Sequence, residues 1–144
     1  MFRRLSDQVL ASPQITPDDL AEAKAQGVGL IINNRPDGES EDQVPGSQIE
    51  AAARALGLDY VAIPVTHAGF SGPQVEAMAA ALAGARGKVL AYCRSGTRSS
   101  LLWGLAEASR GKNPADLIAQ AAQAGYDLSP VRAMMDMLKA RSGA

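Results

Sequence analysis

The sequence contains one cysteine and one histidine in 144 residues. A single cysteine cannot form a disulfide within the chain, and it leaves no second cysteine to resolve an oxidised thiol. One histidine and one cysteine also lack the spacing typical of zinc ligands, so we expect neither a metal site nor a cofactor. Any thiol relay would therefore need a partner molecule.

Charge of one sign and long apolar runs are also scarce. Fourteen Lys and Arg residues face fifteen Asp and Glu residues, giving a net charge of −1, so we expect no nucleic-acid partner. No stretch approaches the roughly 18 apolar residues of a membrane span, and residues 1–19 lack an apolar segment of signal-peptide length. We therefore expect a cytoplasmic protein, and a hydrophobic content of 47% is sufficient for the core of one domain over residues 1–144.

Short apolar runs of buried-strand type alternate with helical patterns along the chain. Repeated alternation of this kind predicts an α/β fold of three layers, in which a short, mainly parallel central sheet is flanked by helices and followed by a C-terminal helical run. Capping residues and glycine stops set the helix limits, with Thr16 expected as the first N-cap. Strands are predicted at 28–34, 58–65 and 88–93, with 8–12 as an edge strand, and helices at 17–26, 47–57, 73–87, 99–110, 114–124 and 129–141.

The cysteine lies where the third predicted strand meets a helix, in "YCRSGTRS". Ligands of parallel α/β folds gather at the carboxyl ends of the strands. There Gly96 allows a tight path with inward N–H groups, the following helix adds its positive dipole end, and Arg98 can clamp an oxyanion in a bidentate manner. We therefore predict Cys93 as a nucleophile and Arg98 as its catalytic partner, with substrate-binding residues Arg94, Ser95, Gly96, Thr97 and Ser99.

The alternative for Cys93 is a small buried core residue, as most free cysteines are. Two arginines and three small polar residues in the next six positions favour the nucleophile, because a structural cysteine needs none of them. The same positive field that holds an anion also stabilises a thiolate.

Three further side chains are candidates outside this loop. Arg35, near Asp37 and Glu39 in the loop after the first buried run, either contacts substrate or pins its own loop through local ion pairs. His67 is either a site residue or a solvated loop residue. Trp103 is expected to pack in the core.

Four spaced motifs, "INNRPDGE", "IPV", "VLAYCRSGTRSSLLW" and "AGYDLS", resemble the beta-lactamase-hydrolase-like family, phosphatase-like domain, over about residues 3–138. The resemblance implies a fold like that of dual-specificity phosphatases and association with sulfide-oxidising enzymes. It also implies that Ser99 hydrogen-bonds the thiolate and that Tyr126 lies beneath the cysteine loop. The loop itself resembles those of both rhodanese-type sulfurtransferases and cysteine-dependent phosphatases.

Two departures from the phosphatase pattern favour sulfur transfer. Only four residues separate Cys93 from Arg98, where phosphatases have five, and "THAGFSG" after the second strand contains no Asp to protonate a leaving group. We therefore predict a sulfurtransferase that moves sulfane sulfur from thiosulfate or a persulfide to a thiol such as glutathione through a Cys93 persulfide. The alternatives are a cysteine phosphatase acting through a phosphocysteine, with His67 as acid, and a non-catalytic module that senses anions or persulfides.

Overall fold

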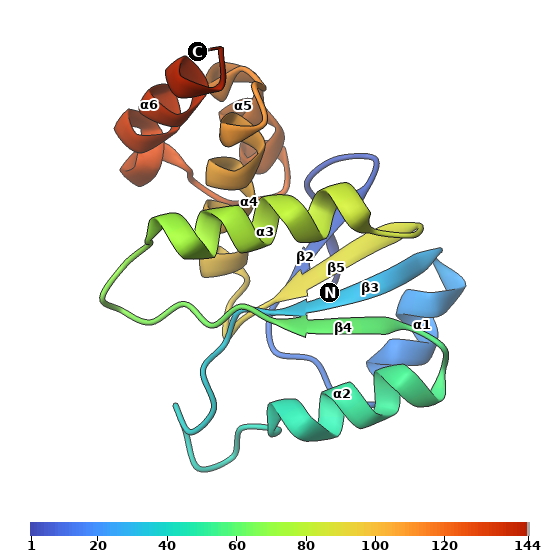
Figure 1. The fold of residues 1–144 in the computed structure, drawn as a ribbon. Coiled ribbons are helices and arrows are strands. Elements are labelled where there is room, and N and C mark those ends of the chain that lie inside the picture. Colours follow the sequence, from blue (N-terminus) through green and yellow to red (C-terminus); the bar gives the residue numbers. More distant parts are fainter. Residues whose placement is uncertain (144) are drawn as a thin grey trace.

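The computed structural model describes residues 1–143 and contains a five-stranded sheet between two layers of helices (Figure 1). The strand order is β1-β2-β5-β3-β4. Strands β2, β5, β3 and β4 are parallel, and only β1 pairs in the antiparallel direction, at one edge. The predicted three-layer α/β fold with a mainly parallel sheet is therefore confirmed. The strands are β1 (Arg3–Arg4), β2 (Val9–Ser12), β3 (Val28–Asn33), β4 (Asp59–Ala62) and β5 (Lys88–Tyr92).

The central strands β3 and β5 are mainly apolar because both of their faces are covered. In β3, Leu30 and Ile32 pack into the core on one side of the sheet, whereas Val28 and Ile31 pack into the core on the other side. Successive side chains of a strand point to opposite faces, so a strand of this kind has no polar alternation. This explains why the predicted buried strands become the middle of the sheet.

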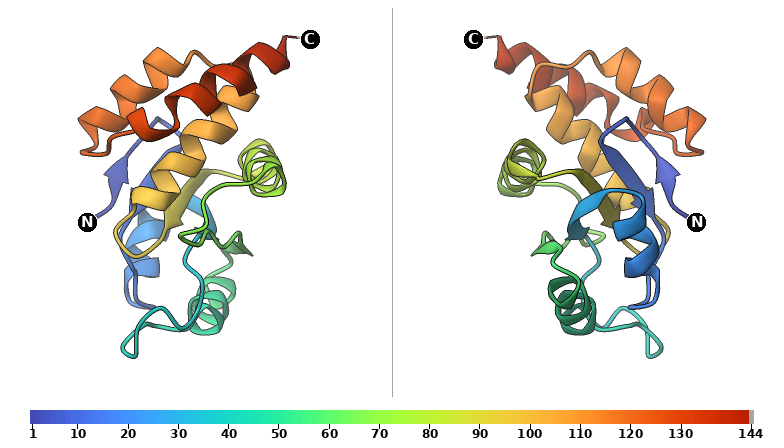
Figure 2. Two further views of the ribbon diagram at one scale, coloured as in Figure 1. Left: turned by 90° about the vertical axis from the view of Figure 1, so that its left-hand side faces the viewer. Right: turned by 90° about the vertical axis from the view of Figure 1, so that its right-hand side faces the viewer.

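The helices form an unequal pair of layers on the two faces. Helices α1 (Asp19–Ala25) and α2 (Gly46–Ala55) cover one face, and α3 (Gly72–Gly84) and α4 (Thr97–Ser109) cover the other (Figures 1 and 2). Helices α5 (Pro114–Gln123) and α6 (Arg132–Ser142), the latter preceded by a 3-10 turn, pack outside α4. Because α4 lies between the sheet and these two helices, it is buried nearly all round, and Trp103 is in the core as predicted.

Several boundaries differ from the predicted ones. The first helix starts at Asp19 because the residues before it form a turn, in which the Thr16 carbonyl accepts the N–H of Asp19 at 3.0 Å. Strand β2, which was predicted at the edge of the sheet, is the second strand instead, because β1 pairs with its outer side. Helix α4 starts at Thr97, two residues early, because Gly96 acts as its N-cap with a φ of 93°.

Candidate active site

The carboxyl ends of the parallel strands bring three loops to one edge of the sheet. Arg35 follows β3, Val65 follows β4 and Cys93 follows β5. Hydrogen bonds extend past the strand ends, from Ile63 N–H to the Asn33 carbonyl at 2.9 Å and from Asn34 N–H to the Tyr92 carbonyl at 2.8 Å. The candidate site is thus built on a rigid sheet edge.

The Cys93 side chain is fully buried beneath its own loop. The backbone N–H of Gly96 donates to the Cys93 sulfur at 3.1 Å. Gly96 takes a left-handed φ of 93°, which L side chains rarely adopt, and helix α4 begins at the next residue, Thr97. The sulfur therefore lies at a helix N-terminus with an amide hydrogen aimed at it, which is an environment that favours negative charge.

Three residues of the loop between Cys93 and Arg98 are exposed to solvent, although Cys93 itself is buried. Arg94, Ser95 and Thr97 are exposed, and the Ser95 hydroxyl donates to the Thr97 hydroxyl at 3.1 Å. All three residues belong to the predicted anion-binding segment. Their side chains are available to a molecule that approaches from solvent.

Asn34 ties the sheet edge to α4. Its side-chain amide donates to the Ile63 carbonyl at 2.9 Å, and its side-chain oxygen accepts from the Ser99 hydroxyl at 2.8 Å. Asn34 and Ser99 are both fully buried. The hydroxyl that the family resemblance places against the thiolate is thus directed to Asn34, so Ser99 anchors the helix that carries Arg98.

Arg98 is held by a carboxylate from a different loop. Glu39 accepts from both terminal nitrogens of Arg98, at 2.7 and 2.8 Å, and the Val65 carbonyl accepts from Nη1 at 2.7 Å. A guanidinium has five N–H donors. Among residues 1–143, the hydrogen bonds of Arg98 to Glu39 and Val65 use Nη1 twice and Nη2 once, so the edge formed by Nε and Nη2 remains able to bind an oxyanion.

The charges of this cluster shift its pKa values in the expected directions. Hydrogen bonding from Arg98 lowers the pKa of Glu39 to about 2, against a smaller opposing effect of burial and with help from Arg35. The hydrogen bond to Glu39 raises the pKa of Arg98, and Cys93 adds to this effect. At neutral pH both groups are therefore charged.

Arg35 reaches the site through Glu39. Its Nε donates to Glu39 at 2.9 Å, and Nη1 donates to Gln14 at 3.0 Å. The Arg35 side chain is 4% exposed, and Asp37 accepts from the N–H of Gly46 at 2.9 Å, which fixes the start of α2. These contacts are those of the local-ion-pair alternative, and they also place Arg35 one side chain away from Arg98.

Sequence reasoning missed the role of Glu39 and left His67 open. Glu39 and Arg98 are 59 positions apart, and the only local signal was the spacing of four residues between Arg35 and Glu39. His67 is exposed in the loop that follows Val65, whose carbonyl contacts Arg98. The sequence distance of two residues keeps His67 near this side of the site.

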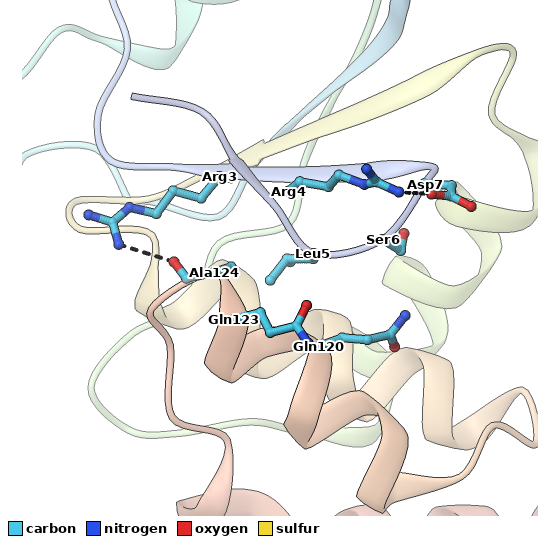
Figure 3. A pocket seen from close by; sticks show the side chains of 8 residues that line it. All are labelled: Arg3, Arg4, Leu5, Ser6, Asp7, Gln120, Gln123 and Ala124. Carbon is cyan, nitrogen blue, oxygen red and sulfur yellow. Dashed lines mark hydrogen bonds and ion pairs between the residues drawn. The ribbon is translucent and has the colours of Figure 1, made fainter.

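A separate cavity of about 600 Å³ lies between the N-terminal segment and α5 (Figure 3). Arg3 and Arg4 project from opposite ends of its upper wall, and Arg4 pairs with Asp7. Within residues 1–143 no group of three or more His, Cys, Asp or Glu side chains is arranged to hold a metal ion. In the same part of the chain, no helix has both the length and the apolar character needed to cross a membrane.

The fold and the cysteine loop define the class as cysteine-phosphatase-like. The family model described as beta-lactamase hydrolase-like protein, phosphatase-like domain, matches residues 1–110. The chain belongs to this family, as the motifs indicated. A beta-lactamase hydrolase-like protein of Xylella fastidiosa is 36% identical over 126 residues, which are 86% of this chain and 29% of the relative. The chain thus spans less than a third of the length of the curated relatives it matches.

Solved structures agree with this class. A candidate phosphatase from Neisseria meningitidis shares 35% sequence identity and superposes with a TM-score of 0.81, covering 94% of this chain and 96% of that one. The core catalytic domain of the PP-IP phosphatase SIW14 from S. cerevisiae has a TM-score of 0.68 at 10% identity, covering 94% of this chain and 83% of that one, and shows similarity of fold alone.

The sulfurtransferase prediction is wrong, because the family and the 35% identical structure described as a candidate phosphatase favour the phosphatase alternative. It relied on a loop one residue short and on a missing Asp, and both features concern substrate fit and leaving-group protonation. Neither feature distinguishes the nucleophile or the anion cradle, which the two reactions share. The comparisons also give no support to glutathione or to sulfide-oxidising enzymes as partners.

Proposed function

We propose that this domain is a cysteine-dependent phosphatase in which Cys93 is the nucleophile. The observation that carries the proposal is the Cys93 sulfur at the N-terminus of α4, where it accepts the Gly96 N–H at 3.1 Å, with Arg98 in the first turn of the same helix and its guanidinium held by Glu39. Its support from similarity is the phosphatase-like family and the 35% identical structure described as a candidate phosphatase.

In the first step the Cys93 thiolate attacks the phosphorus of a phosphomonoester. The S–P bond forms as the P–O bond to the leaving group breaks, and the leaving oxygen departs with the bonding electrons. Negative charge on the equatorial oxygens is stabilised by the loop N–H groups and by the Nε–Nη2 edge of Arg98. Glu39 takes the other edge, so it orients Arg98 without occupying the anion site.

In the second step water attacks the phosphocysteine. The new O–P bond forms, the S–P bond breaks, and inorganic phosphate and the thiolate are released. His67 is the one titratable residue of the loop 66–72, and we assign it to protonate the leaving oxygen and then to accept the proton of the attacking water. Arg94, Ser95 and Thr97 would contact the substrate from the exposed side of the loop.

The test is release of inorganic phosphate from an aryl phosphate by the wild-type domain and by Cys93→Ser. We expect turnover by the wild type, rapid formation of a phosphocysteine trapped by acid quenching, and loss of both in the variant. Ser100→Ala is a matched control, since its hydroxyl donates to the Gly96 carbonyl and makes no hydrogen bond to the Cys93 sulfur. Oxyanion binding without turnover in the wild type would refute the phosphatase and favour a binding module.

A further inference from the structure

One peptide group of the cysteine loop is held at both of its polar ends. The N–H of the Ser95–Gly96 peptide, which belongs to Gly96, donates to the Cys93 sulfur at 3.1 Å. The carbonyl of the same peptide, which belongs to Ser95, accepts from the Tyr126 hydroxyl at 3.3 Å. In a trans peptide these two groups lie in one plane and point in opposite directions. Fixing the carbonyl therefore fixes the direction of the N–H.

Close packing reinforces this hydrogen bond, which at 3.3 Å is long. A Cβ atom placed on Gly96 would lie 2.2 Å from the Tyr126 hydroxyl oxygen and 2.9 Å from Cζ of the same ring. The phenol end therefore fills the space that a side chain at position 96 would need. With φ at 93°, Gly96 is required both for the turn and for this approach.

Tyr126 is itself held from its other side. It is 8% exposed, and the Arg3 guanidinium carbon lies 5.5 Å from its ring centroid, which is a cation–π distance. Arg3 in turn donates to the Ala124 carbonyl at 3.0 Å, at the end of α5 (Figure 3). Burial raises the pKa of Tyr126, so its hydroxyl keeps its hydrogen at neutral pH.

We propose that Tyr126 is a positioning residue of this site, whose hydroxyl orients the Ser95–Gly96 peptide so that its N–H faces the Cys93 sulfur. A flipped peptide would present the Ser95 carbonyl to the thiolate and to the bound anion, and would destabilise both. The consequence for turnover depends on the phosphatase function proposed above. The consequence for the reactivity of Cys93 does not.

The experiment measures alkylation of Cys93 by iodoacetamide between pH 5 and 9 in Tyr126→Phe, which keeps the ring and removes the hydroxyl. We expect alkylation at pH 6 to be about three- to tenfold slower than in the wild type. We also expect kcat for an aryl phosphate to fall by a similar factor at pH 6. An unchanged alkylation profile in the folded variant would overturn the proposal.

Tyr92→Phe is the matched control. Its hydroxyl is buried and has no hydrogen-bond partner among residues 1–143, so its removal should leave the alkylation profile unchanged. If Tyr126→Phe does not fold, Arg3→Met provides the second test, since it removes the support behind the ring and should slow alkylation at pH 6 at least twofold. A wild-type profile in Arg3→Met would then overturn the proposal. Absence of turnover in every form, with the alkylation shift present, would refute only the phosphatase function.

Discussion

Replacing Glu39 by Gln tests how strongly the ion-pair cluster holds the site. The carboxylate of Glu39 accepts three hydrogen bonds from two guanidinium groups, and its side chain is 16% exposed. Gln keeps the shape of the side chain but removes its charge and one acceptor. Arg35 and Arg98 would then lose their shared counter-charge in a largely buried place.

The expected magnitude follows from the pKa of Glu39. A pKa lowered from 4.5 to about 2 corresponds to roughly 3 kcal/mol of stability, at about 1.4 kcal/mol for each pH unit. Partial exposure screens the charges, so we expect a loss of about 2 kcal/mol at pH 7 in Glu39→Gln. Because the folded pKa is depressed, this contribution is fully present above pH 4.5 and is lost as the pH falls towards 2.

The assay is urea unfolding of the wild type and Glu39→Gln at several pH values between 7 and 2.5. The difference in unfolding free energy should be about 2 kcal/mol at pH 7, begin to shrink below pH 4.5 and nearly vanish at the lowest pH. Glu41→Gln is the control, since Glu41 is exposed in the same loop. A difference that stays constant with pH, or one that Glu41→Gln reproduces, would refute the reasoning.

Three further predictions concern the cysteine loop and its neighbours. Arg98→Lys should lower kcat for an aryl phosphate about 100- to 1000-fold, because an ammonium group cannot bind two oxygens in the plane that Glu39 sets. His67→Asn should slow hydrolysis of an alkyl phosphate about 100-fold but leave nitrophenyl phosphate nearly unchanged, because only the alkoxide needs a proton. Gly96→Ala should cost about 3 kcal/mol of unfolding free energy and Gly69→Ala about 1 kcal/mol, since both have positive φ but only Gly96 meets another side chain within 3 Å.

Each of these has an outcome that contradicts it. Arg98→Lys with at least half the wild-type kcat would show that bidentate binding is not used. Equal slowing of both substrates by His67→Asn would exclude proton donation to the leaving group. Equal costs at Gly96 and Gly69, measured by thermal or urea unfolding, would show that the contact with Tyr126 contributes little to stability.

Much of the fold follows from local patterns in the sequence. The apolar run at β3 and the pair Asn113–Pro114 are examples, and the Asn113 side chain accepts from the N–H of Ala115 at 2.9 Å, as an N-cap should. The predicted start of α4 is two residues too late, because capping rules favour Ser and Thr, whereas Gly96 caps this helix through its backbone conformation. Helix propensities do not predict such a backbone conformation.

The candidate site was predictable only where it is local. Cys93 and Gly96 lie three residues apart, so the loop could be recognised from its own sequence. The contacts of Glu39 with Arg98 and of Asn34 with Ser99 join residues 59 and 65 positions apart, and no local pattern specifies them. The loop length and the missing Asp favoured sulfur transfer, but both are local features, whereas the family that corrects the prediction is defined over residues 1–110.

Asn34 makes its bonds entirely to other parts of the sheet edge and to α4, through its backbone and its side chain together. The strand ends and the first turn of α4 must therefore move as one body, with a constant spacing between nucleophile and guanidinium. In the proposed reaction, a phosphate ester would meet a rigid receptor on that side. The segment around Glu39 is attached to the strand ends and α4 chiefly by its side chains. Any structural adjustment to different esters would therefore have to come from this segment.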